Sequence, residues 1–252
     1  MSAVFFAYGP LRIPLPRSLG RIYGTWLEAN AFSDARSGAT RSLKERCEGF
    51  SGLARRVLDN HGVVMEVRGP RPRPGSMIAC NHLSYLDPLI VVAQCPSVPV
   101  AKSEVESWPV IGAAGRDAGV LFNERSNIHQ GASVLRGMRR AIEVGVSVLN
   151  FPEGTTSFGE TLLPFKRGMF GVARITCAPV VPTVLRFDDV KMCWVGDMGF
   201  VPHYLDLIRR PVTKGVIVHG DPIDSREFDS AEALSAATAA AMYALRTEHF
   251  GI

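Results

Sequence analysis

Short apolar runs alternate with segments of helical periodicity along most of this 252-residue chain. Runs with the length and β-branched composition of strands lie at residues 63–67, 77–80, 98–101, 120–122, 146–151, 180–187 and 216–219. Helical patterns lie between or after them, at residues 88–94, 108–117, 130–143, 167–176 and 230–250. This order predicts βαβ units, and therefore an α/β fold whose mainly parallel central sheet is flanked by helices.

Residues 1–60 do not continue this alternation. Three prolines within the first sixteen residues prevent one long helix there, although residues 19–27 can form a short one. Apolar residues recur at three- and four-residue steps over residues 37–60, which predicts an amphipathic helix. No internal repeat or low-complexity linker divides the rest. We therefore predict an N-terminal helical, membrane-proximal extension over residues 1–60 and a single α/β domain over residues 61–252.

The charge is distributed unevenly. The net charge of +4 is too small for a dedicated nucleic-acid-binding protein, but residues 1–75 hold 12 of the 28 Lys and Arg and only 6 of the 24 Asp and Glu. A basic end on a chain that is 46% hydrophobic is suited to an anionic membrane surface. A solvated helix with arginines on its outer face explains the same charge. Apolar runs such as residues 89–93 fall far short of the roughly 20 residues that a span needs, so we expect peripheral attachment.

The cysteines indicate the compartment. There are five, an odd number, and no two have the Cys-x-x-Cys spacing, so neither a disulfide framework nor a zinc site is predicted. A reducing compartment is expected. Together with the basic end, this predicts a peripheral protein on the cytoplasmic side of the cell membrane.

The first motif that can carry chemistry is Asn-His-Leu-Ser-Tyr-Leu-Asp-Pro at residues 81–88. His82 and Asp87 would stand ~140° apart on a regular helix, so they can meet only if the chain turns between them. Asp87 then orients His82 as a general base. The alternative is that Asp87 caps a helix beginning at Pro88. No Gly-x-Ser-x-Gly elbow supplies a nucleophile, which indicates that the hydroxyl of the substrate attacks.

The second motif is Phe-Pro-Glu-Gly-Thr-Thr-Ser at residues 151–157, at the end of an expected strand. Ligands bind at the carboxyl ends of parallel strands in such folds. Gly154 permits close approach of the backbone, and Thr155 and Thr156 offer donors for an anion or a developing oxyanion. The alternative is an ordinary turn with Glu153 exposed.

Together the two motifs resemble the glycerolipid acyltransferases, the family of 1-acylglycerol-3-phosphate acyltransferase. Further blocks follow in the order of that family, at residues 101–112, 119–125, 164–168 and 178–182. The resemblance therefore covers roughly residues 81–182 in several ordered blocks, which makes it far more specific than either motif alone.

The resemblance implies acyl transfer without an acyl-enzyme. His82, oriented by Asp87, would deprotonate the hydroxyl of a lysolipid, which attacks the thioester of acyl-CoA or acyl-carrier protein. Lys102 and Arg125 would hold the anionic head group. The other expected substrate-binding residues are Glu153, Gly154, Thr155, Thr156 and Lys166. No metal or redox cofactor is needed, because a thiolate is already a good leaving group.

One position departs from the family. Many phosphatidate-forming members have an arginine where this chain has Thr156, which weakens the case for a phosphate-bearing acceptor. Lys166 or Arg167 could compensate. We expect 1-acyl-sn-glycerol-3-phosphate as the acceptor, with lyso-ornithine lipid or another lysolipid as the alternative. A thioesterase-like hydrolase and a non-catalytic lipid-binding module are the alternatives of another class.

Overall fold

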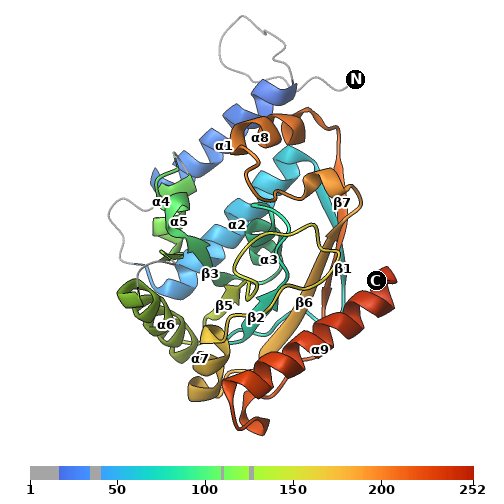
Figure 1. The fold of residues 1–252 in the computed structure, drawn as a ribbon. Helices are drawn as coiled ribbons and strands as arrows, with labels where there is room; N and C mark the ends of the chain where they lie inside the picture. Colours follow the sequence, from blue (N-terminus) through green and yellow to red (C-terminus); the bar gives the residue numbers. More distant parts are fainter. Residues whose placement is uncertain (1–16, 35–40, 109–110, 125–127) are drawn as a thin grey trace, which may run out of the picture.

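A seven-stranded sheet forms the centre of the computed structural model, which describes residues 17–34, 41–108, 111–124 and 128–252 (Figure 1). The strands are β1 (Val63–Arg68), β2 (Met77–Cys80), β3 (Ser97–Lys102), β4 (Leu121–Asn123), β5 (Ser147–Asn150), β6 (Val180–Phe187) and β7 (Thr213–His219). Their order in the sheet is β1-β7-β6-β2-β5-β3-β4. The run from β6 to β4 is parallel throughout, whereas β7 pairs antiparallel with β6 and parallel with β1. The predicted α/β fold with a mainly parallel sheet is confirmed.

Helices cover both faces of the sheet (Figure 1). One face carries α1 (Arg17–Asp34), α2 (Leu43–His61), α3 (Asp87–Gln94), α5 (Ile111–Ala118) and α8 (Phe200–Arg209). The other carries α6 (Ile128–Glu143), α7 (Gly168–Thr176) and α9 (Ala231–Phe250). The short helix α4 (Ser103–Glu106) and the 3-10 turns η1 (Val190–Met192) and η2 (Ser225–Glu227) connect these elements.

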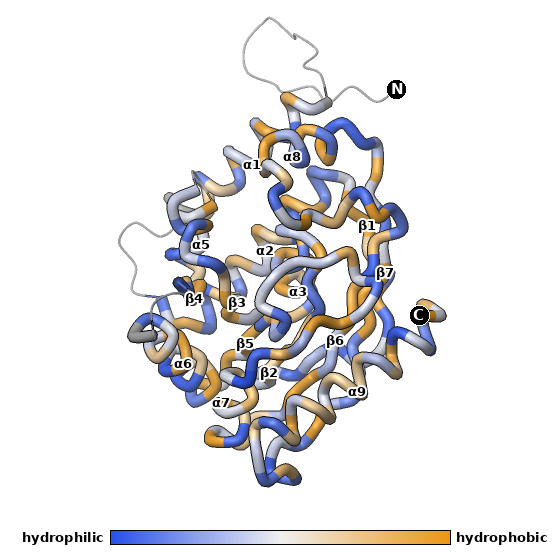
Figure 2. The backbone as a smooth tube through the Cα atoms, in the orientation of Figure 1, coloured by the Kyte–Doolittle hydropathy of each residue, from blue (hydrophilic) through white to orange (hydrophobic). Residues whose placement is uncertain are grey.

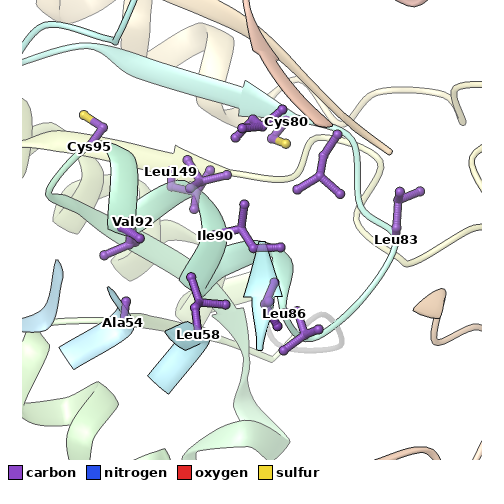
Figure 3. Packing of buried hydrophobic residues seen from close by; sticks show 14 of the residues in the cluster. Ala54, Leu58, Cys80, Leu83, Leu86, Ile90, Val92, Cys95 and Leu149 are labelled. Atoms are coloured by element: carbon purple, nitrogen blue, oxygen red, sulfur yellow. The ribbon is translucent and has the colours of Figure 1, made fainter. Parts of the chain in front are cut away.

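The strands divide their side chains between two cores because successive residues of a strand point to opposite faces. In β2, Ile78 and Cys80 belong to the core under α2 and α3, while Met77 and Ala79 belong to the core under α6, α7 and α9. Figure 3 shows the first core, where Ile90 of α3 lies between Leu149 of β5 and the α2 side chains. Burying one such aliphatic side chain stabilises the fold by roughly 1.5–3 kcal/mol.

The N-terminal helices differ in extent from the expected ones. The helix expected over residues 37–60 begins at Leu43, because Ser42 accepts a hydrogen bond from the Glu45 N–H while the Glu45 carboxylate accepts one from the Ser42 N–H. Residues 37–40 lie outside the described part of the chain. The helix expected over residues 19–27 is longer and forms α1.

Helix α8 was not predicted from the sequence. Pro202 lies in its first turn, where the missing N–H of proline costs nothing. The apolar residues Phe200, Tyr204, Leu207 and Ile208 nevertheless recur at helical spacing, so the sequence does carry a signal for this helix.

Three parallel strands, β2, β3 and β5, bring three of the expected site residues to one edge of the sheet. His82 follows β2, Glu153 follows β5 and Lys102 ends β3, each at the carboxyl end of its strand. Arg125 follows β4 but lies among residues 125–127, outside the described residues. The topology therefore gathers segments that are far apart in the sequence, as Figure 1 shows for β2, β3 and β5.

Candidate active site

Asn81 fixes the point where the chain leaves β2. Its Nδ2 donates to the carbonyl of Leu185 in β6 at 2.9 Å, and its Oδ1 accepts the Leu185 N–H at 2.7 Å. The side-chain amide thus continues the pairing of the sheet by one step after β2 ends. This buried bond positions the residue that follows, His82. The sequence places Asn81 in the first motif but does not by itself indicate this role. The available signal was an asparagine directly after an apolar strand.

His82 and Asp87 form a hydrogen-bonded pair. The Nδ1 of His82 lies 2.8 Å from Oδ2 of Asp87. Asp87 is completely buried, whereas the His82 side chain keeps 21% of its surface exposed. A carboxylate accepts a hydrogen bond, so Nδ1 carries the proton and Nε2 has the free lone pair of a base. The structure therefore brings together the two residues expected to meet across the turn.

The interpretation of Asp87 as a helix cap is wrong. Asp87 is already the first residue of α3, the cap position is Leu86, and no side chain caps the helix. The Asp87 carboxylate points back along the chain instead. Its Oδ2 also accepts the N–H groups of Leu83 at 2.6 Å and Ser84 at 2.8 Å. Together with the bond from His82, one carboxylate oxygen thus accepts three hydrogen bonds, which hold Asp87 against the turn.

Phe151, the first residue after β5, holds the plane of the imidazole. Its ring stacks on that of His82 with centroids 4.0 Å apart and planes 17° apart. The stack and the bond to Asp87 together restrict the imidazole to one orientation. The sequence identified Phe151 only as part of a strand and a motif, because its contact with His82 joins two strands that are separated along the chain.

Glu153 lies behind His82 and not on the surface. It is 4% exposed, with Oε1 accepting the His82 N–H at 3.0 Å and Oε2 accepting the Leu163 N–H at 2.9 Å. Burial raises the pKa of Glu153, although these two bonds and the nearby charges of His82 and Arg246 act to lower it. The alternative of an ordinary turn with an exposed glutamate is therefore wrong.

A largely apolar cavity of about 650 Å³ opens beside His82. It extends between α1, α2, α3, α5 and α8, and side chains such as Trp26, Leu53 and Leu89 line it. Among the expected substrate-binding residues, four line the same cavity: Lys102, Gly154, Thr155 and Thr156. A cavity of this kind can accommodate an acyl chain beside the base.

Lys102 and Lys166, which we expected to bind the head group, are held less firmly than His82 and Asp87. The Lys102 ammonium pairs with Glu104 at 2.6 Å and its side chain is 51% exposed. Lys166 does not line the cavity; its side chain runs past Gly154, close to where a Cβ at that position would stand, and its N–H donates to the carbonyl of Pro152. Gly154 has a φ of +72°, a backbone conformation that favours glycine.

An aromatic wall that sequence reasoning missed closes one side of the cavity. Tyr85, Trp108, Trp194 and Phe200 line it and contact one another edge-on or tilted. The Tyr85 hydroxyl also lies 3.0 Å from Nδ1 of His203 in α8. Tyr85 lies in the first motif, but its contacts with Trp194 and Phe200 join segments far apart in the sequence, which no local pattern indicates.

The remaining titratable groups near the site suit a structural role. Cys80 is buried, as expected for a small core residue, and burial raises the pKa of its thiol with Asp87 and Glu153 adding to the rise. Within the part of the chain that the structure describes, no cluster of His, Cys, Asp and Glu is arranged to hold a metal ion.

Comparison with known proteins places this geometry in a family. Residues 64–186 match the family model described as Acyltransferase. A lyso-ornithine lipid O-acyltransferase of Pseudomonas aeruginosa is 31% identical over 188 residues, which cover 72% of this chain and 72% of that protein. This chain belongs to the acyltransferase family.

Other members match over shorter segments. A 1-acyl-sn-glycerol-3-phosphate acyltransferase of Neisseria meningitidis is 37% identical over 139 residues, or 54% of each chain. The chain thus spans about half the length of the first curated relatives that it matches. The crystal structure of the 1-acyl-sn-glycerophosphate acyltransferase from Thermotoga maritima superposes with a TM-score of 0.69 at 19% identity, covering 93% of this chain and 95% of that one. That likeness shows a shared acyltransferase fold.

Proposed function

We propose that this member of the acyltransferase family is an O-acyltransferase that moves a fatty acyl group from a thioester to the free hydroxyl of a lysolipid. The observation that carries the proposal is the His82–Asp87 pair on the wall of an apolar cavity. A base fixed beside space for an acyl chain supports a reaction between a hydroxyl and an acyl donor.

The reaction that we propose needs no group beyond the two substrates and the dyad. Nε2 of His82 takes the proton of the lysolipid hydroxyl while its oxygen attacks the thioester carbonyl carbon. The tetrahedral intermediate then collapses, the carbon–sulfur bond breaks, and the imidazolium returns its proton to the leaving thiolate. The products are an ester and a free thiol. Asp87 keeps Nδ1 protonated and stabilises the transient imidazolium, as the aspartate of a Ser-His-Asp triad does.

Neighbouring residues support this chemistry in different ways. Glu153 holds the His82 backbone N–H, which makes it a positioning residue in our proposal. Thr155 and Thr156 line the cavity and offer hydroxyl donors to the oxyanion or to the acceptor. Lys102, Arg125 and Lys166 are proposed to attract the anionic head group. Acyl-CoA or acyl-carrier protein is the proposed donor, with no metal or redox cofactor.

The first acceptor that we propose is 1-acyl-sn-glycerol-3-phosphate, which would give phosphatidic acid. The relative from Neisseria meningitidis carries that substrate in its name. Lyso-ornithine lipid is the second candidate. Two observations favour it: Thr156 stands where many phosphatidate-forming members have an arginine, and the Pseudomonas aeruginosa relative matches over 72% of both chains.

We further propose that α1 docks the protein on the cytoplasmic side of the cell membrane. None of the described helices is long and apolar enough to cross a membrane. Helix α1 nevertheless exposes five large apolar side chains: Leu19, Ile22, Tyr23, Trp26 and Leu27. Two of these five side chains, Ile22 and Trp26, also line the cavity, so a lipid can pass from the surface toward His82 beside this helix. Figure 2 shows α1 at the end of the molecule remote from α6 and α7.

The test is a panel assay. Purified protein is incubated with one acyl-CoA and, separately, with lysophosphatidic acid, lyso-ornithine lipid and lysophosphatidylcholine, and the products are followed by mass spectrometry. We expect an acylated lysolipid and a stoichiometric amount of free thiol. Thiol release that no lysolipid accelerates would instead establish a thioesterase, and vesicle binding without any thioester turnover would leave a lipid-binding module.

A further inference from the structure

The loop between β5 and α7 holds His82 from both sides. Besides the bond from the His82 N–H to Glu153, the carbonyl of His82 accepts the Ser157 N–H at 2.9 Å. Oε2 of Glu153 meanwhile accepts the N–H of Leu163, ten residues further along the same loop. The position of the base therefore depends on the conformation of residues 153–163.

Residues 153–163 form neither a helix nor a strand, and the far side of this loop packs against α9. The guanidinium of Arg246 donates from Nη2 to the carbonyl of Gly159 at 2.6 Å and to the carbonyl of Glu160 at 2.9 Å. The Tyr243 hydroxyl, one helical turn away, lies 3.1 Å from Oγ1 of Thr161. Both contacts join residues more than 80 positions apart.

Arg246 is an unusual residue in such a place. It is only 3% exposed, and no described residue satisfies its buried Nη1. Burying a guanidinium is costly unless its donors find acceptors. Here the acceptors of Nη2 are two backbone carbonyls of one loop, and an apolar side chain at position 246 could not donate a hydrogen bond to either. The same positive charge acts to keep the Glu153 carboxylate ionised.

We propose that Arg246 is a positioning residue for catalysis: from the C-terminal helix it clamps the loop of residues 157–163, which in turn holds Glu153 and the backbone of His82. Arg246 lies outside residues 64–186, which match the family model, whereas the loop that it holds lies inside them. The clamp makes α9 part of the active-site framework. The expected effect of Arg246 on kcat rests on the proposed acyl transfer, whereas its expected effect on the conformation of the loop does not.

The structural consequence is tested by amide hydrogen exchange on the substrate-free protein. In Arg246→Met we expect the amides of His82, Ser157 and Leu163 to exchange at least about tenfold faster, because the loop opens more often. Arg246→Lys keeps the charge and one donor group, so the same amides should exchange at rates between those of the wild type and those of Arg246→Met. The matched control is Arg186→Met, since Arg186 also donates to a carbonyl of α9, that of Phe250, but does not touch the loop. Unchanged exchange in Arg246→Met would overturn the clamp whatever reaction the protein catalyses.

The kinetic consequence is tested in the acyl-transfer assay. Displacing a catalytic group slightly costs rate and not affinity, so Arg246→Met should lower kcat about 100-fold while KM for the thioester stays within about threefold. Arg246→Lys should recover at least a tenth of the lost rate. Because a loss of folded protein also lowers the apparent kcat at unchanged KM, kcat is expressed per folded molecule, quantified by circular dichroism, and the recovery in Arg246→Lys separates positioning from unfolding. A wild-type kcat in Arg246→Met, with the wild-type enzyme active, would refute the clamp and leave the proposed function intact.

Tyr243→Phe provides a variant that is safe for folding, because Tyr243 is 44% exposed and loses only its hydroxyl. We expect faster exchange at residues 161–163 and a kcat lowered about fivefold, the effect of one hydrogen bond. If Arg246→Met fails to fold, Arg246→Lys and Tyr243→Phe decide the question. Wild-type exchange and kcat in both would overturn the proposal.

Discussion

The base and the cations of this site are held in opposite ways. His82 is fixed on every side: Asp87 and Phe151 hold its ring, while Glu153 and Ser157 hold its backbone. Lys102, at the carboxyl end of a neighbouring strand, is half exposed and pairs with a surface glutamate. The half proposed to be catalytic is preorganised, and the half proposed to hold the head group is solvated.

The base and the cations therefore determine different properties of the site. A preorganised base lowers the barrier of any reaction that needs a proton removed at that point, so the reaction class follows from it. Solvated cations contribute affinity that depends on the ligand that reaches them. Reaction class and acceptor choice are therefore encoded separately, and substitutions in the two halves should have separable effects.

The largest effect should come from Asp87→Asn. Oδ2 of Asp87 accepts hydrogen bonds from Nδ1 of His82 and from the N–H groups of Leu83 and Ser84, so the amide oxygen of asparagine takes that position and keeps the three bonds. The imidazolium formed during the reaction then lacks the negative charge that stabilises it, so kcat should fall by about 10²–10³-fold, part of what general-base catalysis contributes. Steady-state kinetics measure it. Asp59→Asn, an exposed carboxylate on α2, is the control; equal kcat values for the two variants would show that the dyad does not act as a base.

A smaller effect is expected at Lys102. Lys102→Met should raise KM for an anionic lysolipid about tenfold and leave kcat nearly unchanged, since one partly solvated charge-assisted contact is lost. Glu104→Gln should act in the opposite direction, lowering KM by about twofold, because it frees the ammonium from a surface pair. Lys44→Met on α2 serves as the control. A loss of kcat in Lys102→Met would show that the two halves are not separable.

The smallest effect concerns the surface. Trp26→Ser on α1 should weaken binding to anionic vesicles about threefold, by removing apolar area from the lipid contact. Ile175→Ser is a demanding control, since Ile175 is 72% exposed against 49% for Trp26 but lies on α7. Co-sedimentation with phosphatidylglycerol vesicles compares them. If Ile175→Ser reduces binding as much as Trp26→Ser, α1 has no special part in docking.

The sequence predicted what local patterns encode. Apolar runs identified the strands, and the turn between β2 and α3 followed from the spacing of His82 and Asp87. The contacts that complete the site could not be predicted, because they join distant segments: Asn81 bonds Leu185 and Arg246 bonds Gly159, with separations of 104 and 87 residues. No period or motif links such pairs. Helix α8 was missed although Phe200, Tyr204, Leu207 and Ile208 recur at helical spacing, so the sequence did not prevent this prediction.

The central claim is that His82 activates the hydroxyl of a lysolipid toward an acyl thioester. The most direct test incubates wild-type protein and His82→Ala with acyl-CoA and 1-acyl-sn-glycerol-3-phosphate, and measures the diacyl product by mass spectrometry. The account predicts product from the wild type and a loss of at least about 10³-fold in His82→Ala, the share that a general base with its orienting partner contributes, with unchanged circular dichroism. Wild-type rates of diacyl product from His82→Ala would contradict it.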